Sequence, residues 1–169
     1  MQFKSTLLMA AALAGSALAD ADTSSLQATL TSTTQIDVAS SCSFKSGYTA
    51  TAQADLDTLT SCEAIDGDLY ITGDLGSAAI ANVRAVYGDL VVYNATALTS
   101  FSADSINTIT GELRLTGLTV LDSVSMGGLS SVGAINWVTL PALTDTGLTS
   151  VTECNAILIS DTQLGSLDV

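Results

Sequence analysis

The sequence predicts an all-β fold: a right-handed parallel β-solenoid with leucine-rich-like coils of about 22 residues. Two observations carry this prediction. A short phrase, glycine-acid-leucine-x-apolar, returns at nearly constant intervals along the chain. Further apolar residues then follow each phrase at nearly constant distances. A stack of similar coils presents an extended surface, so we expect a binding or scaffolding protein rather than an enzyme.

The phrase has three clear copies and two looser ones, at 67–71, 88–92, 111–115, 134–137 and 156–159. Their first apolar residues are 21, 23, 22 and 22 residues apart. Within each copy apolar residues alternate with others, as in a strand with one buried face. We therefore expect the first and third residues of every strand, including Trp137, Ile157 and Ile159, to lie in the core.

The rest of the coil also repeats, with apolar residues 5, 8, 13, 16 and 19 positions after Leu113 and, apart from Cys154, again after Ile135. Thr, Ser, Gly and β-branched residues separate them and favour strands and turns. Cys154 occupies the last of these positions, where earlier coils have Ile109 and Val132. We expect it to be a buried free thiol, with a reactive or intermolecular thiol as the alternative.

A glycine precedes each of the first four strands, and Asn155 precedes the fifth. These glycines are Gly67, Gly88, Gly111 and Gly133. Glycine and asparagine tolerate a positive φ best, so we predict a tight backbone corner with φ above zero at each position. A phosphate-binding role is not favoured, because the chain contains neither GxGxxG nor GxxxxGK[ST].

The chain divides into four segments. Residues 1–19 have the pattern of a secretory signal peptide: Lys4, a short apolar stretch and Ala17-Leu18-Ala19 as the cleavage site. Residues 20–41 are a Ser/Thr-rich segment, 42–64 a cap and 65–169 the solenoid repeats. The apolar stretch of the signal is too short to span a membrane. We therefore expect a secreted protein.

Cys42 and Cys62 enclose the only helical pattern, in which Ala52, Leu56 and Leu59 share one face. A disulfide between these cysteines would hold a capping helix over the first coil. Closing a loop of this length is worth about 3 kcal/mol in the chain-entropy model.

Charge and composition exclude several functions. The formal net charge of −13 argues against nucleic acids and anionic membranes as partners. The chain has no histidine and only three dispersed cysteines, so we expect no metal site, no cofactor and no His-dependent catalytic set.

In combination, these features resemble a known family. The cap cysteines, the Gly-Asp-Leu-x-Ile strand starts and the stretches NATALTSFSADSINTITGELRL (94–115), INWVTLPAL (135–143) and ILISDTQLGSLD (157–168) are similar to fungal GPI-anchored cell-wall organisation proteins. That family includes sporulation-specific wall proteins, and its repeats resemble the receptor L-domain. The resemblance covers residues 40–169, the N-terminal portion of a typical member. It implies a non-catalytic glycoprotein of the cell wall or the outer face of the plasma membrane, needed for wall organisation and integrity.

The resemblance also defines what this sequence lacks. The second half of the repeats, the Ser/Thr-rich stalk and the GPI signal are missing from these 169 residues. We therefore expect a truncated version of a longer architecture, with membrane attachment only through an anchor that this chain lacks.

The enzymatic alternative is a β-helix polysaccharide lyase or hydrolase. Asp68, Asp89 and Glu112 follow the phrase glycines and should form an outward column of carboxylates, one strand spacing apart. In such an enzyme this column would serve as an acid pair or as a Ca²⁺ site. The simpler interpretation is a set of solvated acids beside glycine corners. We favour it because Arg114 is the only nearby cation and no histidine is available.

A binding surface is more readily placed. The outward residues of the predicted sheet are Tyr70, Val91, Tyr93, Arg114, Asn136, Val138 and Leu158. An exposed Tyr and Arg patch on a flat sheet suits recognition of cell-wall glycans or wall proteins, although missing structure or sugar could instead cover this face. Asn94-Ala95-Thr96 is the only N-glycosylation sequon, and its position at a predicted corner favours modification over a purely local turn role.

Overall fold

The computed structural model describes residues 35–165; the predicted signal peptide and most of segment 20–41 lie outside these residues. The elements, in chain order, are the 3₁₀ helix η1 (Ser40–Cys42), β1 (Tyr48–Ala50), α2 (Gln53–Thr58), the 3₁₀ helix η2 (Leu59–Ser61), β2 (Ala64–Asp66), β3 (Leu69–Ile71), β4 (Ser77–Ala79), β5 (Ala85–Tyr87), β6 (Leu90–Tyr93), β7 (Ser100–Ser102), β8 (Thr108–Thr116), β9 (Ser123–Ser125), β10 (Ser131–Leu140) and β11 (Glu153–Thr162). Within the described range, neither the length nor the apolar character of any helix would suffice for a membrane span.

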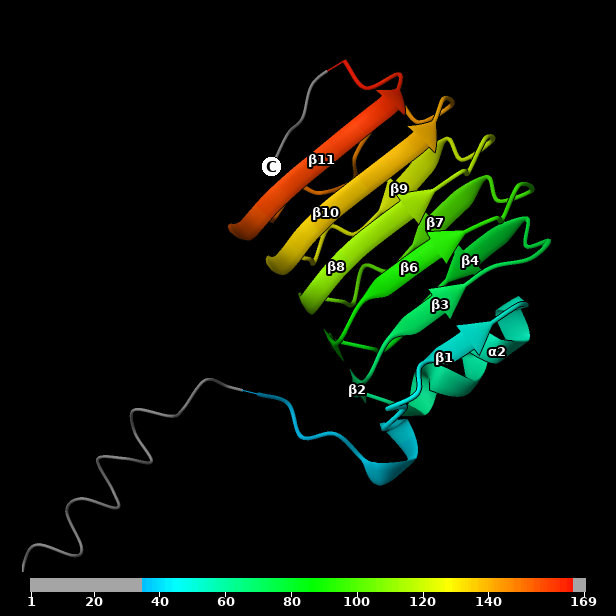
Figure 1. Cartoon of the computed structure of the whole chain (residues 1–169). Coiled ribbons are helices and arrows are strands. Elements are labelled where there is room, and N and C mark those ends of the chain that lie inside the picture. Colours follow the sequence, from blue (N-terminus) through cyan, green and yellow to red (C-terminus); the bar gives the residue numbers. More distant parts are fainter. Residues whose placement is uncertain (1–34, 166–169) are drawn as a thin grey trace, which may run out of the picture. The chain divides into compact units, whose positions relative to one another are not determined.

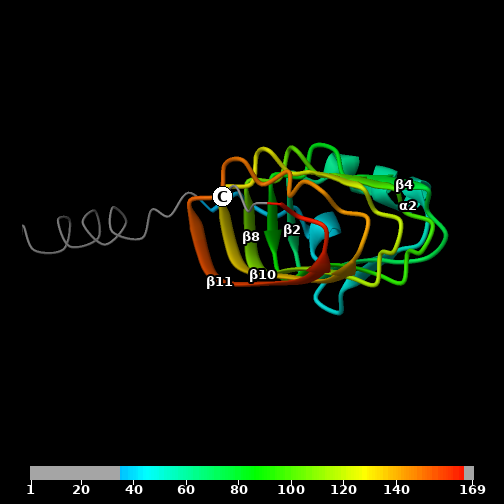
Figure 2. The same cartoon turned by 90° about the horizontal axis from the view of Figure 1, so that it is seen from above.

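All paired strands within residues 35–165 are parallel and form two sheets. The larger sheet has eight strands, with the main order β1-β3-β6-β8-β10-β11 and β2 and β5 alongside. The smaller sheet has the order β4-β7-β9. The strands stack as rungs from β1 and α2 at one end to β11 at the other (Figure 1). Seen from above, the coils are flattened loops in which β4 lies across the interior from β10 (Figure 2). The predicted parallel β-solenoid is confirmed.

The register places each phrase directly over the previous one. Leu69 pairs with Leu90, Leu90 with Leu113, and Leu113 with Ile135. The step shortens from 23 to 22 residues at an irregularity in the pairing of β8 with β10, between Val132 and Ala134. One extra residue in β8 is absorbed there without changing which side chains face inward.

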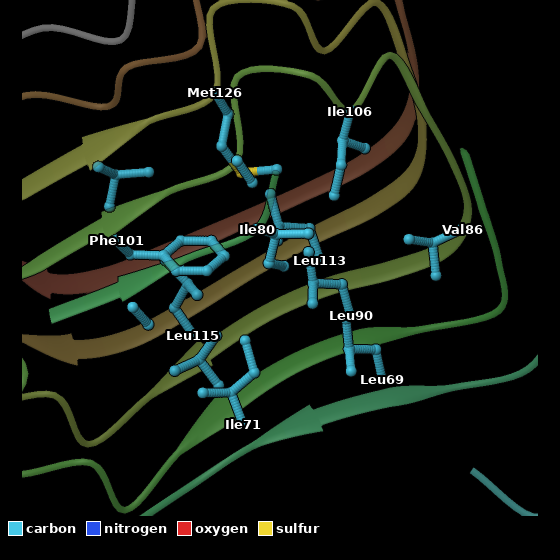
Figure 3. Close-up of a cluster of buried hydrophobic side chains, with 14 of the residues drawn as sticks. Leu69, Ile71, Ile80, Val86, Leu90, Phe101, Ile106, Leu113, Leu115 and Met126 are labelled. Atoms are coloured by element: carbon cyan, nitrogen blue, oxygen red, sulfur yellow. The ribbon is translucent and has the colours of Figure 1, made fainter. Parts of the chain in front are cut away.

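The core fills the interior between the two sheets. Leu69, Leu90 and Leu113 form one inward row and are fully buried. Figure 3 shows this row on one side of the interior, with Ile106 and Phe101 reaching in from other parts of the coils. Trp137 is also fully buried, as its inward position predicts, although its indole N–H has no hydrogen-bond partner in the described structure.

Backbone corners with positive φ lie at the other end of the strands from the phrase glycines. Gly73, Asn94, Gly117, Thr139 and Asp161 occupy equivalent positions, with φ between 54° and 100°. The prediction of positive φ before each strand was wrong at Gly88, Gly111, Gly133 and Asn155, and was right only at Gly67 (126°). At Gly88, Gly111 and Gly133 glycine is required because the preceding coil leaves no space for a side chain. An added Cβ at Gly88 would lie 2.5 Å from the Gly67 carbonyl oxygen.

The N-terminal end is capped. The structure joins Cys42 to Cys62 by a disulfide with a Cα–Cα distance of 5.8 Å. Leu56 of α2 and Leu59 of η2 are buried. Ala52 was expected on the same face, but it precedes α2 and is exposed. The Gln53 amide makes two 2.9 Å hydrogen bonds with the backbone of Ala79, which satisfies the edge of β4. The expected disulfide-pinned helical cap is therefore part of the fold.

The last described coil differs from the ones before it. Ile157, expected in the core, is 43% exposed, and Ile159 is only partly buried. No strand pairs with the outer edge of β11 among the described residues, so these side chains lack the cover that the next coil supplies elsewhere. Cys154 is likewise half-buried rather than buried; its thiol donates to the Ala156 carbonyl oxygen at 3.2 Å.

Candidate binding face and acidic column

The candidate binding face is the outward side of the β3-β6-β8-β10-β11 sheet. Its first row is continuous in register: Tyr70, Val91, Arg114, Asn136 and Leu158. A second row, two residues further along the strands, contains Tyr93, Thr116 and Val138. The structure thus brings all seven predicted face residues together. It adds Thr116, which the alternation in β8 could have identified because Thr116 follows Arg114 by two positions.

The face is not uniformly exposed. Leu158 is 55% exposed and Arg114 is exposed, whereas Tyr70, Tyr93, Asn136 and Val138 are half-buried. Val91 was expected to be open, but only 8% of its surface is accessible. Its neighbours in register are the longer Tyr70 and Arg114, whose side chains can cover a small valine between them. Val91 therefore lies beneath the accessible surface of the face.

Tyr70 is fixed at the N-terminal edge of this face. Its hydroxyl donates a 3.1 Å hydrogen bond to Oδ2 of Asp68. That bond and the negative charge of Asp68 raise the pKa of the Tyr70 hydroxyl. One edge of the ring lies so close to Gly47 that an added Cβ there would approach Tyr70 Cε2 to 2.8 Å. The ring is thus held in place, with its hydroxyl protonated near neutral pH.

Asp68, Asp89 and Glu112 form the column that the sequence predicts, but their hydrogen bonds show a structural use. Oδ1 of Asp68 accepts the backbone N–H of Asp89 at 2.9 Å. Oδ1 of Asp89 accepts the backbone N–H of Glu112 at 2.8 Å. Glu112 in turn forms an ion pair with Arg114. Each acid therefore holds the corner of the following coil or the arginine of the face.

The geometry of this column does not favour a catalytic acid pair. One oxygen of Asp68 and one of Asp89 are committed to neighbouring backbone groups, and the other oxygen of Asp68 accepts from Tyr70. Among the described residues, no group of three or more His, Cys, Asp or Glu side chains is arranged to hold a metal ion. The column instead holds two groups of the face in place, the phenol of Tyr70 and the guanidinium of Arg114.

The sequence reasoning missed a further structural acid, Asp104. Its carboxylate accepts from the Ser125 hydroxyl at 2.7 Å, from the Gly127 N–H at 3.1 Å and from the Ser102 hydroxyl at 3.2 Å. The bonds from Ser125 and Gly127 lower the pKa of Asp104. Ser102 and Ser125 are paired positions of β7 and β9, a ladder that only the register of the smaller sheet reveals.

Asn94 lies at the corner that follows β6 and is exposed. It adjoins Tyr93 in sequence and so borders the second row of the face. Open hollows lie elsewhere in the described part of the chain. One is at the cap, lined in part by Thr51, Gln53 and Asp74, and another is at the N-terminal ends of β8, β10 and β11, where it includes Cys154. No residue of the candidate binding face lines either hollow.

Comparison with known proteins gives relatives of one kind. The chain is 43% identical over 117 residues to the cell wall mannoprotein PST1 of Saccharomyces cerevisiae, covering 69% of this chain and 26% of that protein. It is 32% identical over 140 residues to the cell wall protein ecm33 of Schizosaccharomyces pombe, covering 79% and 33%. A cell surface GPI-anchored protein ECM33 of Candida albicans is 29% identical over 143 residues, covering 83% and 34%. The chain thus spans about a quarter to a third of the length of these relatives.

No protein-family model matches the chain, and no solved structure matches it. The likeness of this chain to known proteins of stated location therefore comes from these relatives. They confirm the resemblance to fungal cell-wall proteins and a location at the cell wall or outer cell surface.

Proposed function

Because the chain belongs to the fungal cell-wall protein family of PST1 and the ecm33 proteins, we propose that it is a non-catalytic component of wall organisation that binds a wall glycan through the candidate binding face. The observation that carries this proposal is the register of the outward rows. Tyr70, Arg114 and Tyr93 stand on one flat sheet face, and two of them are tied to the acidic column.

The chemistry of these groups suits a polyhydroxylated partner. Tyrosine rings offer flat apolar surface to a sugar ring, and a guanidinium donates in a planar fork to hydroxyl oxygens. Tyr70 and Arg114 are held by carboxylates before any ligand binds, so less side-chain entropy is lost on binding. A wall protein is the other partner that such a face could recognise.

The absence of turnover is part of the proposal. Asp68, Asp89 and Glu112 would be the catalytic acids of a lyase or hydrolase, but their contacts support a structural role. We expect no release of reducing ends from β-glucan, chitin, mannan or pectin, with or without Ca²⁺. Turnover that is lost in Asp68→Ala or Asp89→Ala would contradict the proposal and favour an enzyme.

Binding is tested with a matched pair of arginines. Arg114 and Arg84 are each ion-paired with a glutamate, and their side chains are 46% and 55% exposed, but only Arg114 lies on the candidate binding face. We expect Arg114→Ala to weaken sedimentation of the chain with insoluble wall glucan, chitin or mannan by about tenfold, the equivalent of 1.4 kcal/mol. Arg84→Ala should bind like the unaltered chain.

Equal binding by both variants to every glycan would contradict the proposed face. Whole wall material and wall material from which protein has been extracted are then compared. If Arg114-dependent binding occurs only to the unextracted material, the partner is a wall protein.

A further inference from the structure

The sequon at Asn94 is held in a defined turn. Asn94 is exposed and has a φ of 54°, in the left-handed region. Ala95 is fully buried, and Thr96 is exposed on its other side. The buried Ala95 fixes the turn, so the Asn94 side chain projects from a rigid corner rather than from a loose loop.

The neighbouring corners leave space beside it. In the column of left-handed corners, Gly73 precedes Asn94 by one coil and Gly117 follows it by one coil. Neither has a side chain. An added Cβ at Gly117 would meet nothing within 4 Å, whereas one at Gly73 would lie 3.2 Å from the Thr51 carbonyl oxygen. Asn136 provides the contrast: it is half-buried, and its Oδ1 is buried without a partner. Of these two asparagines, only Asn94 has room for a bulky substituent.

We propose that Asn94 carries an N-linked glycan that projects between the glycine corners of the adjacent coils and borders the candidate binding face at Tyr93. In the transfer, the amide Nδ2 of Asn94 attacks the anomeric carbon of a lipid-diphosphate-linked oligosaccharide. The bond from that carbon to the phosphate oxygen breaks, a C–N bond forms, and the amide loses one proton while the lipid diphosphate leaves. This inference depends on the extracellular location of the chain and is independent of the proposed glycan binding.

The direct test uses the unaltered chain secreted from a fungal host. Treatment with peptide:N-glycosidase in heavy-oxygen water should lower its mass and convert Asn94 to an isotopically marked aspartate in the peptide map. Asn94→Gln and Thr96→Ala should each remove the shift, whereas Thr96→Ser, which keeps the sequon, should retain it. Secreted, unaltered chain whose mass does not change, or a marked aspartate elsewhere, would overturn the proposal.

A second test moves the sequon along the column. Gly117-Leu118-Thr119 has a buried middle residue and an exposed threonine, as at Asn94. Gly117→Asn would complete a sequon there, and asparagine is already accommodated at a φ of 54° in this column. In the Asn94→Gln background, this change should restore one glycan on folded, secreted protein. Secretion of the double variant without a glycan would show that the corners are not the accommodating feature.

Discussion

The coil that contains β10 and the coil that contains β11 have the same pattern of residues but different environments. Ile135 and Ile157 are directly paired in register, yet Ile135 is 1% exposed and Ile157 is 43% exposed. The same change occurs at the paired residues Trp137 and Ile159, the second of which is only partly buried. Burial in a solenoid is therefore supplied by the neighbouring coil and not by the coil's own sequence. A strand with the correct pattern still needs cover on both sides.

The largest expected effect tests the middle of the stack. Trp137→Ala should lower the free energy of unfolding by about 3–5 kcal/mol, because it removes a fully buried ring packed between coils. Arg114→Ala, on the adjacent strand and facing outward, should change it by under about 0.5 kcal/mol. Denaturant unfolding of secreted protein measures both. A stable Trp137 variant beside a collapsed Arg114 variant would mean that the strand faces are reversed.

The difference in burial between the β10 and β11 coils is tested by making the same substitution in each. Ile135→Ala should cost about 2–5 kcal/mol, as for other buried isoleucines. Ile157→Ala removes the same atoms from a side chain that is already 43% exposed, so we expect less than half of that cost. The two variants are matched in chemistry and in register. Equal losses would show that β11 is covered in solution.

The capped end provides the next test. Replacing Cys42 and Cys62 with alanine should cost about 3 kcal/mol, since it opens the loop that holds α2 over the first coil. Cys154→Ala is the control, because Cys154 is half-buried and free. Non-reduced peptide mapping should link Cys42 to Cys62 and find Cys154 unlinked; any link to Cys154 would contradict this arrangement.

The smallest effect concerns pH. The N–H groups of Thr51 and Ala52 donate to Asp55 at the start of α2 and lower its pKa. A lowered carboxyl pKa stabilises the fold above the unfolded value, and this contribution is lost as pH falls through the lowered pKa, below about 4. Asp55→Asn should therefore be less stable at pH 7 and should lose less stability on acidification than the unaltered chain. Denaturation midpoints at pH 7, 4 and 3 measure the difference.

Much of this architecture could be predicted from the sequence because the repeat encodes it. The step of 21 to 23 residues determines the register, and alternation in each phrase determines which face is inward. The burial of Trp137 follows from the same alternation, and the capping disulfide follows from the two cysteines that enclose the helical pattern. These features depend on residue type and spacing alone, which the chain displays directly.

The predictions that failed concern contacts between neighbouring coils, which residue type and spacing do not reveal. The phrase glycines are required by a carbonyl oxygen of the preceding coil, which no local propensity reveals. Val91 is covered by neighbours in other strands, and Ile157 and Cys154 are partly open because no strand pairs with the outer edge of β11 in the described structure. The candidate binding face could be placed by alternation, but its accessible part could not.

The ladder of acids gives the stack a direction. At Asp68 and at Asp89 the carboxylate acceptor belongs to the earlier coil and the N–H donor to the later one. Gly88 and Gly111 likewise lie close against the preceding coil. A ribosome releases the N-terminal end first, so every acceptor is synthesised before the donor that it will hold. Asp68 and Asp89 therefore present, each on its own coil, the acceptor to which the next coil along the chain attaches.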